Sequence, residues 1–255
     1  LDKWLDFLSR LKYPKRTVEI GLIGKYVELK ESYKSITEAF IHAGAANEVE
    51  VKIRWIHSEH LTEKNAANTC KGLDGVLVAP GFGERGFEGK VATVQYAREN
   101  KIPYFGSCYG MQAAVIEYAR NVVGLEGASS TEFEADTKYP VIATMQEQVD
   151  ILASGDMGHT MRLGLFEAKL AEGSVVAEVY GKTTVHERHR HRYEVNNNFV
   201  DRLQKAGLKI GGWSADDNLV EMVELEDHPW FIACQFHPEF TSTPRDGHPL
   251  FTSFI

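Results

Sequence analysis

The stretch Ile102-Pro103-Tyr104-Phe105-Gly106-Ser107-Cys108-Tyr109-Gly110-Met111-Gln112 decides the fold, because an apolar run ends in a cysteine flanked by small residues. Residues 102–107 are predicted to form a strand and residues 111–120 a helix. A strand that turns abruptly into a helix leaves little room for side chains beside the turn, which suits the glycines here. The context is that of a nucleophile elbow, in which the reactive side chain stands clear of the sheet.

Outward from this stretch, short apolar runs alternate with helical patterns through the first half of the chain. We expect strands and helices to alternate at residues 18–23 (strand), 33–44 (helix), 49–56 (strand), 75–79 (strand) and 91–100 (helix). This alternation predicts an α/β fold with an open, largely parallel sheet and helices on both faces.

The pattern weakens from about Ser129 to Tyr180, where we expect hairpins and a long surface loop at residues 154–164. A strand-like pattern is again recognisable at residues 220–225 and 230–236. These two runs flank a turn and predict an antiparallel hairpin leading into His237.

Residues 1–16 predict an N-terminal amphipathic helix and linker, followed by a single domain at residues 17–255. The sequence begins at Leu1 rather than at methionine, which favours a piece of a longer polypeptide.

Composition and charge disfavour several classes of protein. The net charge is −8 and the densest basic stretch, residues 188–192, is short, whereas nucleic-acid binding needs a broad positive surface. The three cysteines, Cys70, Cys108 and Cys234, show no paired spacing, which is typical of a reducing compartment. No apolar run reaches the ~18 residues of a membrane span, and no signal peptide is evident. We therefore expect a cytoplasmic protein that binds neither membrane nor nucleic acid.

A cysteine nucleophile needs a base, and His237-Pro238-Glu239 follows a predicted strand. Residues two apart in an extended segment point the same way, so Glu239 is placed to orient the His237 imidazole towards Cys108. The acid follows the histidine here, whereas α/β-hydrolases carry the acid first.

The segment Gly81-Phe82-Gly83-Glu84-Arg85-Gly86 matches the glycine pattern of a dinucleotide-binding loop. It follows about the third strand rather than the first, and no acidic residue ends a strand at the required distance. We interpret it instead as a loop whose backbone N–H groups approach an oxyanion beside Cys108.

The cluster His186, His189 and His191 lacks zinc-type spacing and is interleaved with arginines. Because the arginine charges would repel a cation, we expect no metal here and an arginine that binds a carboxylate.

Three segments, residues 80–83, 106–112 and 235–240, resemble the signatures of class I glutamine amidotransferases. Four more, residues 24–27, 130–133, 160–164 and 187–196, are similar to the glutaminase domain of the CTP synthase family. The resemblance covers residues 18–255 and implies a flavodoxin-like fold. Three residues depart from the family pattern: Pro80 replaces a glycine, Ser107 an aliphatic residue and Tyr109 a leucine.

The resemblance implies Cys108 as nucleophile, His237 as general base and acid, and Glu239 as the orienting carboxylate. The backbone N–H groups of Gly81 and Tyr109 would bind the oxyanion. The implied glutamine contacts are Gly81, Phe82, Tyr109, Gly110, Met111, Gln112, Glu132 at the ammonium and Arg192 at the carboxylate. The implied GTP region comprises Phe82, Arg85, Thr160 and Arg162.

The resemblance also implies partners for the domain. Ammonia would pass to a synthetase domain that converts UTP to CTP with ATP and magnesium, under allosteric activation by GTP, in a tetrameric homo-oligomer. The domain itself would need no cofactor. Since synthetase motifs are absent here, we expect slow glutamine hydrolysis and little response to GTP. Two alternatives stay open: another cysteine hydrolase on this fold, such as a γ-glutamyl hydrolase, and a non-catalytic regulatory or assembly module.

Overall fold

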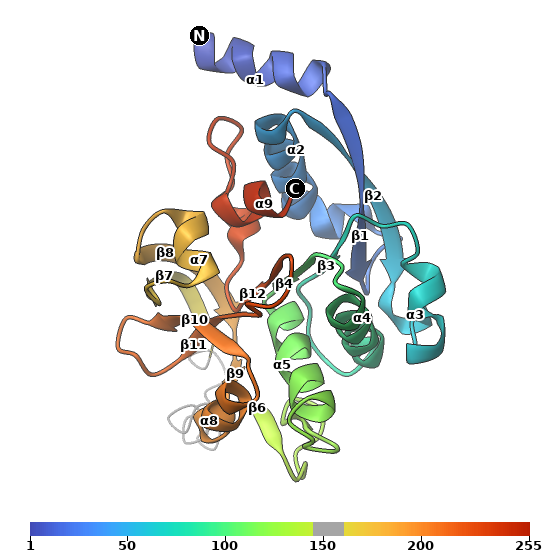
Figure 1. The fold of residues 1–255 in the computed structure, drawn as a ribbon, viewed down its shortest axis with the longest axis vertical. Coiled ribbons are helices and arrows are strands. Elements are labelled where there is room, and N and C mark those ends of the chain that lie inside the picture. The colour runs from blue at the N-terminus through green and yellow to red at the C-terminus, as the bar shows by residue number, and fades with distance from the viewer. Residues whose placement is uncertain (145–160) are drawn as a thin grey trace.

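The computed structural model describes residues 1–144 and 161–255 (Figure 1). A nine-stranded sheet in the order β2-β1-β3-β4-β12-β11-β10-β7-β8 forms its centre. The first five strands in that order are parallel: β2 (Val49–His57), β1 (Arg16–Gly24), β3 (Gly75–Val78), β4 (Tyr104–Ser107) and β12 (Phe231–Cys234). The other four are antiparallel: β11 (Val220–Glu224), β10 (Lys209–Ser214), β7 (Arg162–Leu170) and β8 (Thr184–His191).

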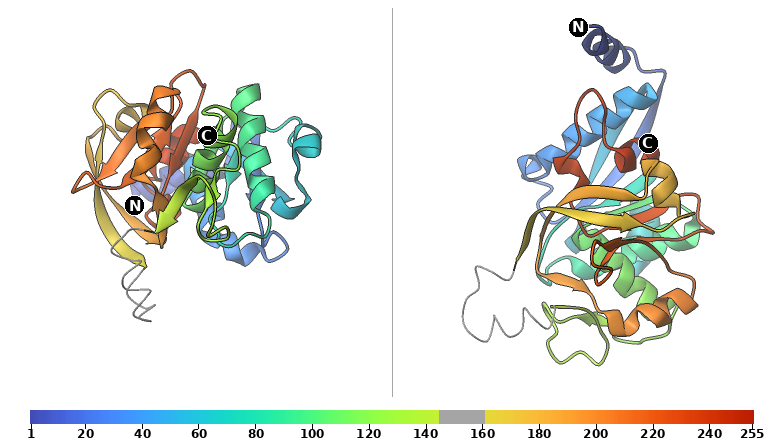
Figure 2. Two further views of the ribbon diagram at one scale, coloured as in Figure 1. Left: turned by 90° about the horizontal axis from the view of Figure 1, so that it is seen from below. Right: turned by 90° about the vertical axis from the view of Figure 1, so that its left-hand side faces the viewer.

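Helices cover both faces of the sheet, and each interface encloses an apolar core (Figures 1 and 2). One face carries α3 (Glu63–Thr69), α4 (Phe87–Asn100), α5 (Tyr109–Asn121) and α8 (Asn197–Lys205). The other carries α2 (Lys34–Asn47), α7 (Val175–Tyr180) and α9 (Pro249–Phe254). Because the central strands are covered on both sides, every residue of β3 and β4 is buried, which explains their continuous apolar runs.

Smaller elements complete the described chain. A three-stranded sheet is formed by β5 (Ser129–Ser130), β6 (Pro140–Thr144) and β9 (Tyr193–Val195). Short 3-10 turns lie at η1 (Lys30–Tyr33), η2 (Ser58–His60) and η4 (Pro238–Phe240). The N-terminal helix α1 (Asp2–Lys12) has no buried residue and projects from the body (Figure 2). No helix within residues 1–144 and 161–255 is long and apolar enough to cross a membrane.

The predicted alternation of strands and helices is confirmed, as is the hairpin of β11 and β12. Residues 154–160 of the predicted surface loop lie outside the described residues. For residues 162–164 the prediction of a loop was wrong, because Arg162 and Leu163 belong to β7 and pair with β8. The β7–β8 hairpin gives little signal in the sequence because β8 buries charged and polar side chains, among them Glu187, His189 and His191.

The junction of β4 and α5 depends on a close approach between helix and sheet. A Cβ atom added at Gly110 would lie 2.3 Å from the carbonyl oxygen of Val78 in β3. A backbone atom cannot move aside as a flexible side chain can. Glycine at this position therefore lets α5 pack against the sheet directly after Cys108.

We expect Gly110→Ala to lower the free energy of unfolding by roughly 3 kcal/mol, the upper range for overpacking a tight site. Urea denaturation measures this change. Gly124→Ala is the control, because Gly124 has φ +79° and open space around it, so only backbone strain of ~1–2 kcal/mol is added. Equal losses in the two variants would contradict the close approach at Gly110.

Candidate active site

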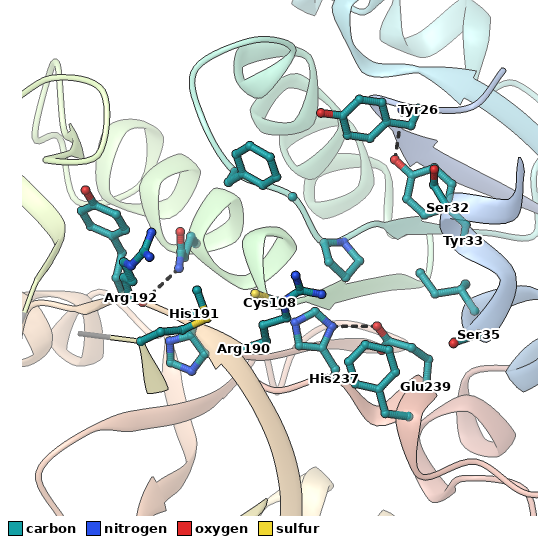
Figure 3. Close-up of a pocket in the computed structure, with 18 of the residues that line it drawn as sticks. Tyr26, Ser32, Tyr33, Ser35, Cys108, Arg190, His191, Arg192, His237 and Glu239 are labelled. Atoms are coloured by element: carbon teal, nitrogen blue, oxygen red, sulfur yellow. Dashed lines mark hydrogen bonds and ion pairs between the residues drawn. The ribbon is translucent and has the colours of Figure 1, made fainter. Parts of the chain in front are cut away.

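Three adjacent strands bring the candidate residues together. β3, β4 and β12 are neighbours in the sheet, and their carboxyl ends lead into the loop at residues 80–83, Cys108 and His237 respectively. Ligands of open parallel sheets bind at such ends. Residues from all three segments line a cavity of about 540 Å³ (Figure 3).

Cys108 occupies a strained turn between β4 and α5. Its φ of 51° and ψ of −100° are unusual for a residue with a side chain, a conformation that costs on the order of 1–3 kcal/mol. Its N–H donates to the carbonyl of Cys234 at 2.7 Å, and its carbonyl accepts from the N–H of Met111 at 3.0 Å. The thiol therefore stands at the N-terminus of α5, where unpaired N–H groups favour negative charge.

His237 is oriented by Glu239 and packed from one side. Its Nδ1 lies 2.8 Å from Oε1 of Glu239, while Oε2 accepts from the hydroxyl of Ser107 at 3.4 Å. The ring of Phe240 stacks on the imidazole with centroids 4.9 Å apart. Within residues 1–144 and 161–255, Nε2 has no hydrogen-bond partner, and it is buried. One nitrogen is thus held by a carboxylate and the other is free for chemistry.

The protonation of His237 reflects two opposing effects. Burial lowers the pKa of the imidazole, because desolvation disfavours a cation. The neighbouring sulfur of Cys108 and the carboxylate of Glu239 outweigh burial and raise that pKa to about 10. The imidazolium is therefore the state of His237 that this arrangement favours near neutral pH.

The glycine-containing loop lies beside the cysteine. Gly81 and Phe82 line the same cavity as Cys108. In the part of the chain that the structure describes, the N–H groups of Gly81 and Tyr109 donate to no protein atom. The segment after β3 thus presents backbone donors near the nucleophile, as expected of an oxyanion-binding loop.

Opposite charges line another part of the cavity. Glu132, Arg192 and Gln112 all contribute to its wall. Burial raises the pKa of Glu132, an effect that the Gly83 N–H at 2.7 Å, Lys25 and Arg192 oppose. A carboxylate and a guanidinium that line one cavity are suited to an ammonium and a carboxylate of one small molecule.

Some predicted contacts lie elsewhere. Tyr109, Gly110 and Met111 are buried in the packing around α5 and are not among the cavity-lining residues. Met111 belongs to the apolar core, and Gly110 is packed against Val78. The side chains of Tyr109 and Met111 thus take part in packing rather than in the cavity lining, and the glutamine contacts of these three residues stay predictions.

The predicted effector residues do not all converge. Thr160 lies outside the described residues. Phe82 lines the cavity, and Arg85 pairs with Glu59 while lying over the ring of Tyr26, 5.5 Å from its centroid. Arg162 instead forms an ion pair with Glu221, with 2.5 Å between Nη1 and Oε1, because a buried carboxylate needs a paired charge.

Other cavity residues were missed from the sequence. Tyr26, Ser35 and Ile36 come from the segment after β1, and Arg190 and Tyr193 come from the end of β8 and from β9. The amide of Gln112 donates to the Tyr193 carbonyl at 3.1 Å. No local pattern identifies such residues, since the segments that carry them are distant in sequence from Cys108.

Comparisons with known proteins agree with this geometry. A family model described as "Glutamine amidotransferase class-I" matches residues 28–255. The CTP synthases of Christiangramia forsetii and Flavobacterium johnsoniae are 54% and 55% identical over all 255 residues, which cover 46% and 47% of their own lengths. The chain thus spans about half the length of the curated relatives it matches.

Solved structures are similar as well. The Trypanosoma brucei CTPS glutaminase domain with bound acivicin superposes with a TM-score of 0.85 at 41% identity, covering 93% of this chain and 92% of that one. A GMP synthase protein from Thermoplasma acidophilum, at 14% identity and a TM-score of 0.56 over 93% of each chain, shares the fold.

We expect the His237 imidazolium to lose its proton near pH 10 in the wild-type chain and at lower pH in Cys108→Ser. A nearby anion stabilises a cation, so replacing the thiolate by a neutral hydroxyl removes the larger of the two contributions that raise the pKa. Histidine ring nitrogen NMR signals, assigned with His237→Gln, measure both midpoints.

His228 is the internal control for this titration. Its pKa is lowered by burial, and its Nε2 lies 3.1 Å from the carbonyl of Ala97. Its titration should be the same in both proteins. An equal His237 midpoint in the two proteins would show that Cys108 and His237 are not electrostatically coupled.

Proposed function

Because the chain belongs to the class I glutamine amidotransferases, and among them to the glutaminase domains of CTP synthases, we propose that Cys108, His237 and Glu239 hydrolyse L-glutamine to glutamate and ammonia. The observation that carries the assignment of roles is the contact of His237 Nδ1 with Glu239. Nε2 of the same imidazole makes no hydrogen bond within the described residues, and His237 lines the same cavity as Cys108.

The reaction begins with the thiolate of Cys108 attacking the side-chain amide carbon of glutamine. The carbonyl oxygen becomes an oxyanion, which the N–H groups of Gly81 and Tyr109 bind. The imidazolium of His237 donates its proton to the departing nitrogen, so ammonia leaves and a γ-glutamyl thioester remains on Cys108.

Hydrolysis of the thioester regenerates the enzyme. Neutral His237 now accepts a proton from water, whose oxygen attacks the thioester carbonyl, and the thiolate leaves as glutamate forms. Glu239 holds the imidazole in position in both half-reactions and stabilises the imidazolium. The net reaction converts glutamine and water into glutamate and ammonia.

Glutamine is oriented by its α-substituents. Arg192 binds the α-carboxylate through its planar guanidinium, and Glu132 binds the α-ammonium. The Glu132 carboxylate is fixed for this role by the Gly83 N–H, and Gln112 is fixed by the Tyr193 carbonyl. These contacts select an amino acid over a simple amide.

In the longer protein, the ammonia supplies a synthetase domain on the same polypeptide. This proposal rests on the CTP synthase relatives, about twice the length of the chain. The substrates there would be UTP and ATP with magnesium, in a cytoplasmic homo-oligomer, and GTP would act as effector near Phe82 and Arg85.

We expect Cys108→Ser to lower kcat for glutamine hydrolysis by at least about a thousandfold, because a hydroxyl is far less ionised than a thiol. Released ammonia is the readout, and mass spectrometry after incubation with acivicin should show an adduct on wild-type Cys108 only. Cys70→Ser is the control, since burial raises the pKa of that thiol to about 11 and keeps it unreactive. Comparable turnover by the serine variant would remove Cys108 as nucleophile.

We expect Arg192→Lys to raise the KM for glutamine about thirtyfold or more, because an ammonium cannot reproduce two parallel hydrogen bonds to a carboxylate and losing such a pair costs roughly 2–5 kcal/mol. Steady-state kinetics measure KM, and Arg202→Lys on the exposed side of α8 is the control. An unchanged KM would exclude Arg192 from the glutamine site.

A further inference from the structure

Protein side chains hold the loop between β3 and α4 at several points. Lys90 Nζ donates to the carbonyl of Ala79 and Lys25 Nζ to that of Phe82, each at 2.5 Å. The phenol of Tyr109 donates to the carbonyl of Gly83 at 2.5 Å, and Glu132 accepts from the Gly83 N–H at 2.7 Å. Glycines give this segment wide conformational freedom, which these bonds remove.

Tyr109 connects this loop to the nucleophile elbow. Its backbone directly follows Cys108, whereas its hydroxyl reaches the loop at Gly83. Only 2% of the residue is exposed. Its ring packs against Phe87 at 5.0 Å between centroids, so the phenol has a fixed direction.

The ring of Tyr109 also lies close to Gly81. A Cβ atom added at Gly81 would lie 3.3 Å from Cδ1 of Tyr109 and 3.3 Å from Nζ of Lys90. Lys90 in turn lies over the Tyr109 ring, 5.0 Å from its centroid. The backbone of Gly81 therefore rests on a surface formed by these two buried side chains.

We propose that the Tyr109 side chain is a positioning residue for the oxyanion, because it ties the loop that carries the Gly81 N–H to the turn that carries its own N–H. Two donors on separate elements bind one oxygen well only when their separation is fixed before the reaction. The inference rests on the proposed function, since an oxyanion forms only if Cys108 attacks a carbonyl.

Lys90 contributes to the same support. It is 1% exposed, and burial lowers the pKa of its ammonium to about 7, an effect to which Lys25 adds and which Cys108 opposes. Its bond to the Ala79 carbonyl anchors the start of the loop as Tyr109 anchors the end.

The test compares Tyr109→Phe with Tyr118→Phe in the 255-residue chain. Tyr118 lies on the same helix and its hydroxyl donates to the carbonyl of Ala206 at 2.7 Å, so this variant loses the same kind of bond outside the cavity lining. Three readouts are needed: kcat and KM for glutamine, inhibition by the γ-aldehyde analogue of glutamine, and the pH profile of Cys108 alkylation by iodoacetamide. The aldehyde forms a hemithioacetal with an oxyanion, whereas alkylation forms none.

We expect Tyr109→Phe to lower kcat about tenfold, the effect of one well-placed hydrogen bond, and to weaken aldehyde inhibition by a similar factor. The KM and the alkylation profile should stay close to those of the wild type. Tyr118→Phe should match the wild type in all three readouts.

An unchanged kcat in Tyr109→Phe would overturn the inference. A parallel fall in kcat and alkylation rate would also overturn it, because the phenol would then act on the thiol, and so would an equal loss in Tyr118→Phe. The proposed function is judged separately: a wild-type chain that neither hydrolyses glutamine nor binds the aldehyde refutes it, whereas wild-type turnover with unaffected Tyr109→Phe refutes only the role of Tyr109.

Discussion

The hydrogen bond from the Cys108 N–H to the Cys234 carbonyl is the interaction on which the site depends. It extends the β4–β12 ladder beyond the Ser107–Cys234 pair, so the elbow is attached to the strand that leads to His237. The strained backbone of Cys108 is tolerated because this bond and the helix that follows determine its conformation together. Cys108 and His237, the proposed nucleophile and base, therefore take their relative positions from strand register rather than from a flexible loop.

The charges around it distinguish His237 from other buried histidines at this edge of the sheet. His189 and His191 are also buried, but burial and then the charge of Arg162 lower their pKa values to about 2 and about 3. His237 is buried too, yet its interactions with Cys108 and Glu239 outweigh burial and raise its pKa. A histidine becomes the cationic partner of a thiolate only where local anions outweigh desolvation.

Much of the fold could be predicted because its signals are local. The continuous apolar runs of β3 and β4 reflect burial on both faces, and the alternation with α4 and α5 indicates parallel pairing. The β7–β8 hairpin could not be predicted in the same way. Its inward positions on β8 hold Glu187, His189 and His191, which form polar contacts with distant residues such as His248 and Glu221.

The sequence by itself predicted Cys108 as nucleophile and His237 as base, because an elbow and a His-x-Glu turn depend on residues a few positions apart. Only the tertiary structure decided which side chains surround them. Arg162 belongs by sequence to an expected effector region, but its guanidinium forms an ion pair with Glu221 of β11. Tyr109 is expected from the sequence only as a backbone donor, but its hydroxyl donates to the carbonyl of Gly83. Both outcomes depend on strand order and on the cost of burying a charge or a hydroxyl without a counterpart, and neither is encoded in a short segment.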